Sequence, residues 1–212
     1  MPLRAFPRRC FVLGAGMLCV LGADPALGAK PDAPGKAYSY RRPTPGSDLE
    51  TGGATIAVRA PLATVRQALL DYGRYKEILP RLSQSRVVAR RGDEAEVYLR
   101  APILRGVAHI WGLVRFSAPE KVGRSYVITG RLLKGNLDAW WGRWRLLECG
   151  KNRTLVNFEQ FIELKIPLPA SLVAPELEWA TRKAVTTIRD TVECAGYERR
   201  RPIPAPAEPP PG

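Results

Sequence analysis

The sequence predicts an α+β domain in which a curved antiparallel sheet of about seven strands wraps around one long C-terminal helix. Three observations support this fold class. Short stretches of alternating polar and apolar residues recur at regular intervals between residues 85 and 163. A helical apolar stripe follows them near the C-terminus. The chain of 212 residues is 45% hydrophobic, which is too apolar for a disordered protein even at a net charge of +13.

The N-terminal residues are not expected to belong to this domain. Residues 1–29 have the pattern of an export signal, because Arg4, Arg8 and Arg9 precede an uncharged apolar run that ends in small residues. The Arg8-Arg9 pair resembles a twin-arginine signal, although Pro7 stands where a polar residue is usual. Both the general secretory and the twin-arginine routes therefore stay open. We expect the protein to be exported, to the periplasm or outside the cell.

Two segments rich in proline flank the predicted domain. Residues 30–51 contain prolines, glycines and many charges, a composition typical of a linker. Residues 198–212 contain consecutive arginines followed by a Pro-rich run, which we expect to be extended or disordered. The domain itself is predicted to span residues 52–197, with no internal repeat.

The domain is predicted to begin with a short strand and two short helices. Apolar side chains alternate over residues 55–59, as in a strand with one buried face. Pro61 then opens a helix, because the missing N–H of proline costs nothing in the first helical turn. Gly73 ends this helix. A second short helical segment, residues 75–79, stops at Pro80.

A meander of six further strands is predicted from residues that alternate with a period of two. These strands comprise residues 86–90, 94–100, 108–116, 126–132, 140–147 and 156–163. One face of the resulting sheet is mostly apolar, and the other is rich in arginine and glutamate. On the charged face we expect exposed cross-strand ion pairs between Glu94, Glu96, Glu159 and Glu163 and Arg100, Arg115, Arg143 and Arg145.

One long helix is predicted near the C-terminus, with Pro175 in its first turn and Gly196 as its stop. No other predicted element is large enough to cover the apolar face of the sheet. A bent sheet around one helix leaves space between the two, so we expect an apolar cavity there. The helix has an apolar stripe on one side formed by Leu177, Ala180, Ala184, Ile188, Val192 and Ala195.

The segment Val65–Pro80, followed by Ser85–Val88, resembles the START-like superfamily, also known as helix-grip or SRPBCC proteins. The similarity is to the polyketide cyclase/coenzyme Q-binding branch and covers roughly residues 53–196. It implies the helix-grip fold and a cavity for a hydrophobic ligand such as a quinone. The chain departs from quinone-binding relatives in its export signal and in Arg81, which stands where an aromatic residue is common.

The side chains predicted to face the cavity are the candidate ligand-binding residues. Burial of apolar surface, at about 25 cal/mol per Å², would supply affinity for a quinone, isoprenoid, sterol or acyl chain. Gln160 would orient a carbonyl or hydroxyl of the ligand, and Gly142 would leave a notch between two tryptophans. A filled core with Gln160 bonded to the backbone is the alternative. The candidates are Ile110, Val114, Phe116, Tyr126, Ile128, Trp140, Trp144, Phe158 and Gln160.

Little in the sequence points to catalysis. His109, the one histidine, is expected on the outer, charged face, and no nucleophile, phosphate-loop or metal-binding motif is present. We therefore predict no catalytic residue, no metal site and no cofactor. Cys149 and Cys194 remain after removal of the signal and either pair as a disulfide or stay as free thiols.

The basic character of the chain, 33 Lys and Arg against 20 Asp and Glu, bears on its partners. Nucleic acid is not an expected partner, because the protein is predicted to be exported and its aromatic residues to be buried. Peripheral contact with an anionic membrane fits an exported protein better. An arginine-rich proteome would also explain the charge, and the oligomeric state stays open.

The predicted function is that of an exported START-like domain that binds a hydrophobic small molecule or lipid in the cavity between sheet and helix. The main alternative is an enzyme of the polyketide aromatase/cyclase type that uses the same cavity, and a third is a structural domain with a filled core. Acidic or basic groups inside the cavity would favour the enzyme. Residues 72–80, 133–139 and 165–171 are expected to gate the entrance.

Overall fold

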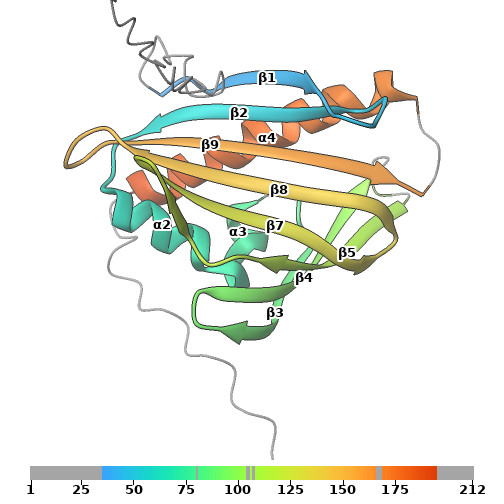
Figure 1. The fold of residues 1–212 in the computed structure, drawn as a ribbon, viewed down its shortest axis with the longest axis horizontal. Coiled ribbons are helices and arrows are strands. Elements are labelled where there is room, and N and C mark those ends of the chain that lie inside the picture. Colours follow the sequence, from blue (N-terminus) through green and yellow to red (C-terminus); the bar gives the residue numbers. More distant parts are fainter. Residues whose placement is uncertain (1–34, 80, 104–105, 107, 166–168, 195–212) are drawn as a thin grey trace, which may run out of the picture.

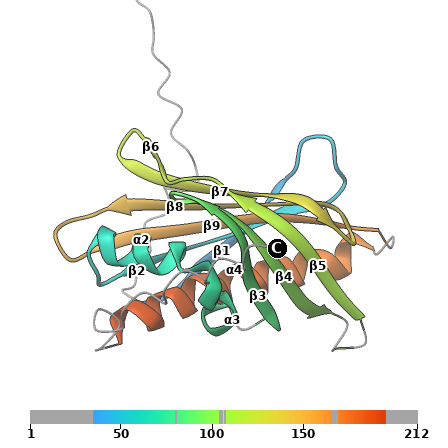
Figure 2. The same ribbon diagram turned by 90° about the horizontal axis from the view of Figure 1, so that it is seen from below.

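The computed structural model describes residues 35–79, 81–103, 106, 108–165 and 169–194. Nine antiparallel strands within these residues form one sheet. The sheet curves over the long helix α4 (Ala170–Glu193), which lies along its inner face, as Figures 1 and 2 show. This arrangement confirms the predicted α+β helix-grip fold.

The strands follow each other in the sheet in the order β1-β2-β9-β8-β7-β5-β4-β3, and β6 pairs with β7. Most neighbours in this order are consecutive in the chain, as in a meander. The exception is the pairing of β2 with β9, which joins the start of the domain to its last strand. The bounds are β1 Tyr38–Pro43, β2 Glu50–Val58, β3 Gln84–Arg91, β4 Glu94–Ile103, β5 Ala108–Phe116, β6 Glu120–Val122, β7 Ser125–Gly135, β8 Leu137–Glu148 and β9 Thr154–Leu164.

Strand β1 corrects the predicted linker. Residues 38–43 were expected to lie in a linker over 30–51, but they form an edge strand paired with β2. The sequence missed it because prolines and charges dominate the segment, and Pro43 is tolerated only because it ends an edge strand. The ring of Tyr40 lies over Gly53 of β2, where a Cβ atom would come within 2.3 Å of it. The predicted signal (residues 1–29) and tail (198–212) lie outside the described residues.

The two short helices after β2 form as predicted. They are α2 (Leu62–Leu70) and α3 (Tyr75–Ile78), joined by the 3-10 turn η1 (Tyr72–Arg74). The apolar side of α2 packs into the core, and Tyr72, Tyr75 and Ile78 are buried with it. Ser85 of β3 donates a hydrogen bond to the backbone oxygen of Tyr72. The helical segment is thereby attached to the edge of the sheet.

Helix α4 begins at Ala170, earlier than predicted, so Pro175 lies in its second turn. The missing N–H of Pro175 leaves one helical carbonyl without its usual donor. The helix nevertheless packs closely on the sheet, since a Cβ atom on Gly52 would lie 3.0 Å from Cβ of Leu177. The buried side of α4 includes most of the predicted stripe, namely Leu177, Ala184, Ile188 and Val192, together with Thr181 and Val185; Ala195 lies outside the described residues.

The outer face of the sheet is partly as predicted. Arg115 and Glu96 form the expected exposed pair, with Nη2 and Oε1 2.7 Å apart. Glu159, in contrast, is only 1% exposed. It accepts hydrogen bonds from Nε of Arg143 at 3.0 Å, Oη of Tyr40 at 3.0 Å and Nη2 of Arg42 at 3.2 Å. The expectation of an exposed Glu159 was wrong because the unpredicted strand β1 supplies two of the side chains that surround it.

Two further observations concern the thiols and the helices of the described residues. Cys149 and Cys194 are both exposed and carry free thiols. In the part of the chain that the structure describes, no helix combines the length and the apolar character that a membrane span requires.

Candidate ligand-binding cavity

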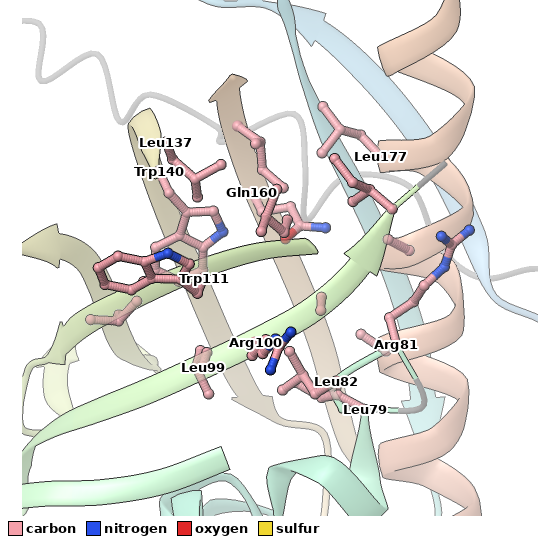
Figure 3. A pocket seen from close by; sticks show the side chains of 18 of the residues that line it. Leu79, Arg81, Leu82, Leu99, Arg100, Trp111, Leu137, Trp140, Gln160 and Leu177 are labelled. Atoms are coloured by element: carbon pink, nitrogen blue, oxygen red, sulfur yellow. The ribbon is translucent and has the colours of Figure 1, made fainter. Parts of the chain in front are cut away.

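A cavity of about 630 Å³ lies between the inner face of the sheet and α4. Its walls come from β4, β5, β7, β8, β9, α4 and the segment around α3. Figure 3 shows leucine and tryptophan side chains from these elements surrounding the space. Both the size and the apolar lining are those of sites that hold one small organic molecule.

Seven of the nine predicted ligand-binding residues line this cavity: Ile110, Val114, Phe116, Trp140, Trp144, Phe158 and Gln160. The other two, Tyr126 and Ile128, do not. Ile128 is 1% exposed and belongs to the solid core. Tyr126 packs against that core, and the guanidinium of Arg66 on α2 lies 5.9 Å from its ring centroid. Alternation along β7 predicts the correct face of the sheet but not which part of that face stays open.

The filled-core alternative describes one half of the space between sheet and helix. Next to α2 and η1 the buried side chains form the core cluster, as in the stacking of Tyr72 on Phe116 with ring centroids 4.6 Å apart. The cavity occupies the other half, beyond Phe116 and towards the start of α4. Phe116 lies on the boundary, because it belongs to the core cluster and also lines the cavity.

Aromatic rings form one wall of the cavity. Trp144 and Phe158 stack with centroids 4.0 Å apart and planes inclined by 20°. The ring of Trp140 lies over two glycines, since a Cβ atom would come within 2.9 Å of it at Gly130 and 3.0 Å at Gly142. The space beside Gly142, predicted to be an open notch, is therefore filled. Trp140 itself occupies it, and the two glycines let the indole lie flat against the sheet.

Gln160 is a buried polar group in this apolar wall. Its side chain is 9% exposed and lies on β9 between Gly142 of β8 and Gly52 of β2. No group among the described residues hydrogen-bonds to its amide, so the alternative of a bond to the backbone is not realised there. The amide is not among the atoms sealed off without a partner but opens onto the cavity, so Gln160 is suited to receive a polar group of a ligand (Figure 3).

Charged side chains line the cavity at its mouth: Arg81, Arg100, Glu176 and Lys183. Sequence analysis missed these residues, and it expected Arg100 on the outer face. Consecutive residues of β4, from Leu99 to Ile103, border the cavity, so at this end of the strand residues of both parities lie next to it. Trp111 borders the cavity, and its ring stacks on that of Tyr98, which was expected on the same outer face, with centroids 6.0 Å apart.

Further apolar lining comes from positions that strand alternation does not identify. Leu79 and Leu82 flank the position of Pro80, and Leu137 and Leu164 lie at strand ends.

The predicted gating loop at residues 133–139 is instead a tight connection between β7 and β8. Its Asn136 accepts a bond from the Trp111 backbone N–H at 2.8 Å and donates one to the His109 backbone oxygen at 2.9 Å.

The other two segments expected to gate the cavity are residues 72–80 and 165–171. Tyr75 and Leu79, from residues 72–80, border the cavity. In the segment 165–171, residues 166–168 lie outside the described residues.

The cavity offers little acid–base chemistry. Tyr75 is buried, which raises the pKa of its hydroxyl well above the ordinary value, and Oη donates a hydrogen bond to the Leu69 backbone oxygen at 2.6 Å. Glu176 is 63% exposed and pairs with Arg81. His109 is exposed and does not line the cavity. Among the described residues no group of three or more His, Cys, Asp or Glu side chains is placed to hold a metal ion.

A curved antiparallel sheet that grips a C-terminal helix around an apolar cavity defines a START-like domain for binding hydrophobic ligands. Residues 58–189 match the family described as polyketide cyclase / dehydrase and lipid transport, and the chain belongs to that family. No curated protein resembles the sequence closely enough to count as a match.

Solved structures share the fold at low sequence identity. A STAR-related lipid transfer protein fragment from Xanthomonas axonopodis superimposes with a TM-score of 0.67 at 18% identity, covering 77% of this chain and 96% of that one. The lipid transfer and protein localization domain of human StarD13 gives 0.61 at 13% identity, with coverages of 73% and 83%. The Zhui aromatase/cyclase from Streptomyces sp. R1128 gives 0.51 at 17% identity, with coverages of 74% and 94%.

Proposed function

We propose that this protein is an exported carrier that holds one hydrophobic small molecule or lipid in the cavity between the sheet and α4. The observation that carries the proposal is the cavity of about 630 Å³, with its aromatic wall and its unpartnered amide. Burying a ligand there would remove apolar surface from water on both partners, at about 25 cal/mol per Å². The lipid transfer proteins with the same fold support the assignment.

The lining favours a flat or elongated apolar ligand. Trp140, Trp144 and Phe158 present ring faces that suit a sterol, a quinone ring or an extended isoprenoid or acyl chain. Gln160 carries both donors and an acceptor, so it would bind either a carbonyl or a hydroxyl of the ligand. One polar contact inside an apolar wall would fix the orientation of the ligand without demanding one chemical structure.

Export is part of the proposal and rests on the sequence of residues 1–29, with its arginines before an apolar run. The net charge of +13, of which residues 1–29 contribute only +2, further supports transient contact with an anionic membrane surface, from which a lipid would be collected or to which it would be delivered.

An aromatase/cyclase activity is the alternative, since an enzyme of that type shares the fold. Such a reaction needs an acid or base held against a buried substrate. The carboxylate of the cavity lining, Glu176, is mostly exposed and already paired with Arg81. This arrangement supports a carrier in preference to an enzyme.

Equilibrium binding of a neutral fluorescent probe, N-phenyl-1-naphthylamine, tests the proposal. Ala180 of α4 lines the cavity, and Ala180→Phe would fill part of it. We expect wild-type protein to bind the probe, and Ala180→Phe to weaken binding by about tenfold, the effect of roughly 1.4 kcal/mol. Ala63→Phe on the exposed side of α2 is the matched control and should bind like wild type. Absence of binding by wild type, or equal binding by all three proteins, would contradict the proposal.

A further inference from the structure

The charged groups at the mouth of the cavity do not balance. Three of the four charged residues in the lining are basic and one is acidic. Arg81 forms an ion pair with Glu176, and both belong to the rim. Arg100 and Lys183 therefore leave an excess of two positive charges beside an apolar interior.

Arg100 and Lys183 come from different elements that border the same opening, β4 and α4. Among the described residues, neither side chain forms a hydrogen bond or an ion pair. Other arginines within the described part of the chain do pair with carboxylates, as Arg115 does with Glu96. Arg100 belongs to the same cavity lining as the apolar Leu99 and Leu82, all labelled in Figure 3, so a cation borders the apolar interior.

A cation next to an apolar cavity favours ligands that have one apolar part and one anionic group. The apolar part of such a ligand fills the cavity, and an anionic group placed at the mouth receives charge-assisted hydrogen bonds. These bonds are stronger than those to a neutral oxygen, and at the edge of a low-dielectric cavity they are screened less than on an open surface.

We infer that the ligand is an anionic amphiphile, with an apolar chain or ring system inside the cavity and one carboxylate or phosphate group bound at its charged border by Arg100 and Lys183. This inference rests on the proposed carrier function and narrows its ligand class. A neutral quinone or sterol would fill the interior but would leave the two cations at the mouth unused.

Two fluorescent probes that differ only in charge test the inference. cis-Parinaric acid carries a carboxylate, and its methyl ester has the same chain without the charge. For the full chain we expect the acid to bind about tenfold more tightly than the ester, a difference of roughly 1.4 kcal/mol, because hydrogen bonds to a charged group are stronger than those to a neutral oxygen. The preference should shrink as the salt concentration rises.

The double variant Arg100→Gln/Lys183→Gln should lose this preference, binding the acid about as weakly as the ester, while its affinity for the ester stays at the wild-type value. Lys121→Gln/Arg124→Gln is the matched control. It removes one lysine and one arginine from exposed positions around the β6–β7 turn, outside the cavity lining, and should keep the preference. Unchanged ester affinity shows that the variants are folded.

The outcomes separate the two proposals. If wild type binds the acid and the ester equally, or if the control loses the preference as well, the anionic site is wrong and the carrier function stands. If wild type binds neither probe, the carrier function itself fails. Competition with oleate, 1-oleoyl-lysophosphatidate and monoolein, which share one acyl chain, then identifies the anion. Stronger displacement by the lysophosphatidate assigns a phosphate group, and stronger displacement by oleate assigns a carboxylate. Equal displacement by the neutral monoolein would contradict the anionic site.

Discussion

The guanidinium group of Arg81 lies over the indole of Trp179, with its central carbon 4.3 Å from the ring centroid. Arg81 follows the segment around α3, whereas Trp179 is on α4. The same guanidinium pairs with Glu176, one turn earlier on that helix. These contacts join the segment after α3 to α4 at the border of the cavity, and we refer to them as a latch.

Loosening this latch should speed the exchange of ligand. In Arg81→Ala both contacts are lost, and together a cation–π contact and an exposed ion pair contribute about 1–2 kcal/mol. We expect the dissociation rate of a bound fluorescent probe, measured by stopped flow, to rise by about five- to thirtyfold. Arg86→Ala, at an exposed position of β3 on the same edge, is the control and should exchange at the wild-type rate. An unchanged rate in Arg81→Ala would exclude the latch.

The buried carboxylate of Glu159 should matter for stability far more than an exposed one. Glu159→Gln removes the charge that Arg42 and Arg143 share, and both arginines remain partly shielded from water. We expect the free energy of unfolding in urea to fall by about 1–3 kcal/mol. Glu96→Gln, which breaks the exposed pair with Arg115, should cost about 0.2–1 kcal/mol. Equal effects would show that the Glu159 cluster is not buried.

Loss of the hydroxyl group from two neighbouring tyrosines should change the free energy of unfolding in opposite directions. Oη of Tyr72 is buried without a hydrogen-bond partner among the described residues, whereas Oη of Tyr75 donates to the Leu69 backbone oxygen. Tyr72→Phe should therefore raise the free energy of unfolding by about 1 kcal/mol, and Tyr75→Phe should lower it by about 1 kcal/mol. Chemical denaturation measures both. A loss of stability in Tyr72→Phe would show that its hydroxyl has a partner.

The same two tyrosines predict a loss of stability at alkaline pH. Burial raises the pKa of both hydroxyls above the ordinary value near 10. In the unfolded chain they ionise at about pH 10, but in the folded chain they keep their protons. Stability is therefore complete below pH 10 and falls as pH rises above it, by at most about 1.4 kcal/mol per pH unit for each tyrosine. Urea titrations from pH 9 to 11.5 should show a shallower fall in Tyr72→Phe, and an identical slope would contradict this origin.

The order of elements, the two short helices and the apolar face of the sheet could be predicted from sequence because local periodicity determines them. The edge strand β1 could not, since its hydrogen bonds come from β2 and its side chains resemble those of a linker. Glu159 shows the same limit. Alternation placed it on the outer face, but only the pairing of β1 reveals that Tyr40 and Arg42 cover it.

The candidate site was predictable in part for a similar reason. Parity along a strand identifies the inner face, and it correctly selected Trp144 and Phe158. It does not show where along the strand the packing opens, so Ile128 was included although it lies in the solid core. Arg100 and Lys183 border the same cavity because one end of β4 lies near α4. The relative position of these two elements cannot be predicted from the local sequence pattern.

Native mass spectrometry of the full chain, purified from its own host, tests the central claim most directly. The account predicts that wild-type protein carries one additional mass, which lipid extraction identifies as an apolar or amphiphilic molecule, and that Ala180→Phe loses it while Ala63→Phe keeps it. A wild-type protein that shows only the mass of its polypeptide, or an adduct that survives Ala180→Phe, would contradict a carrier that uses this cavity.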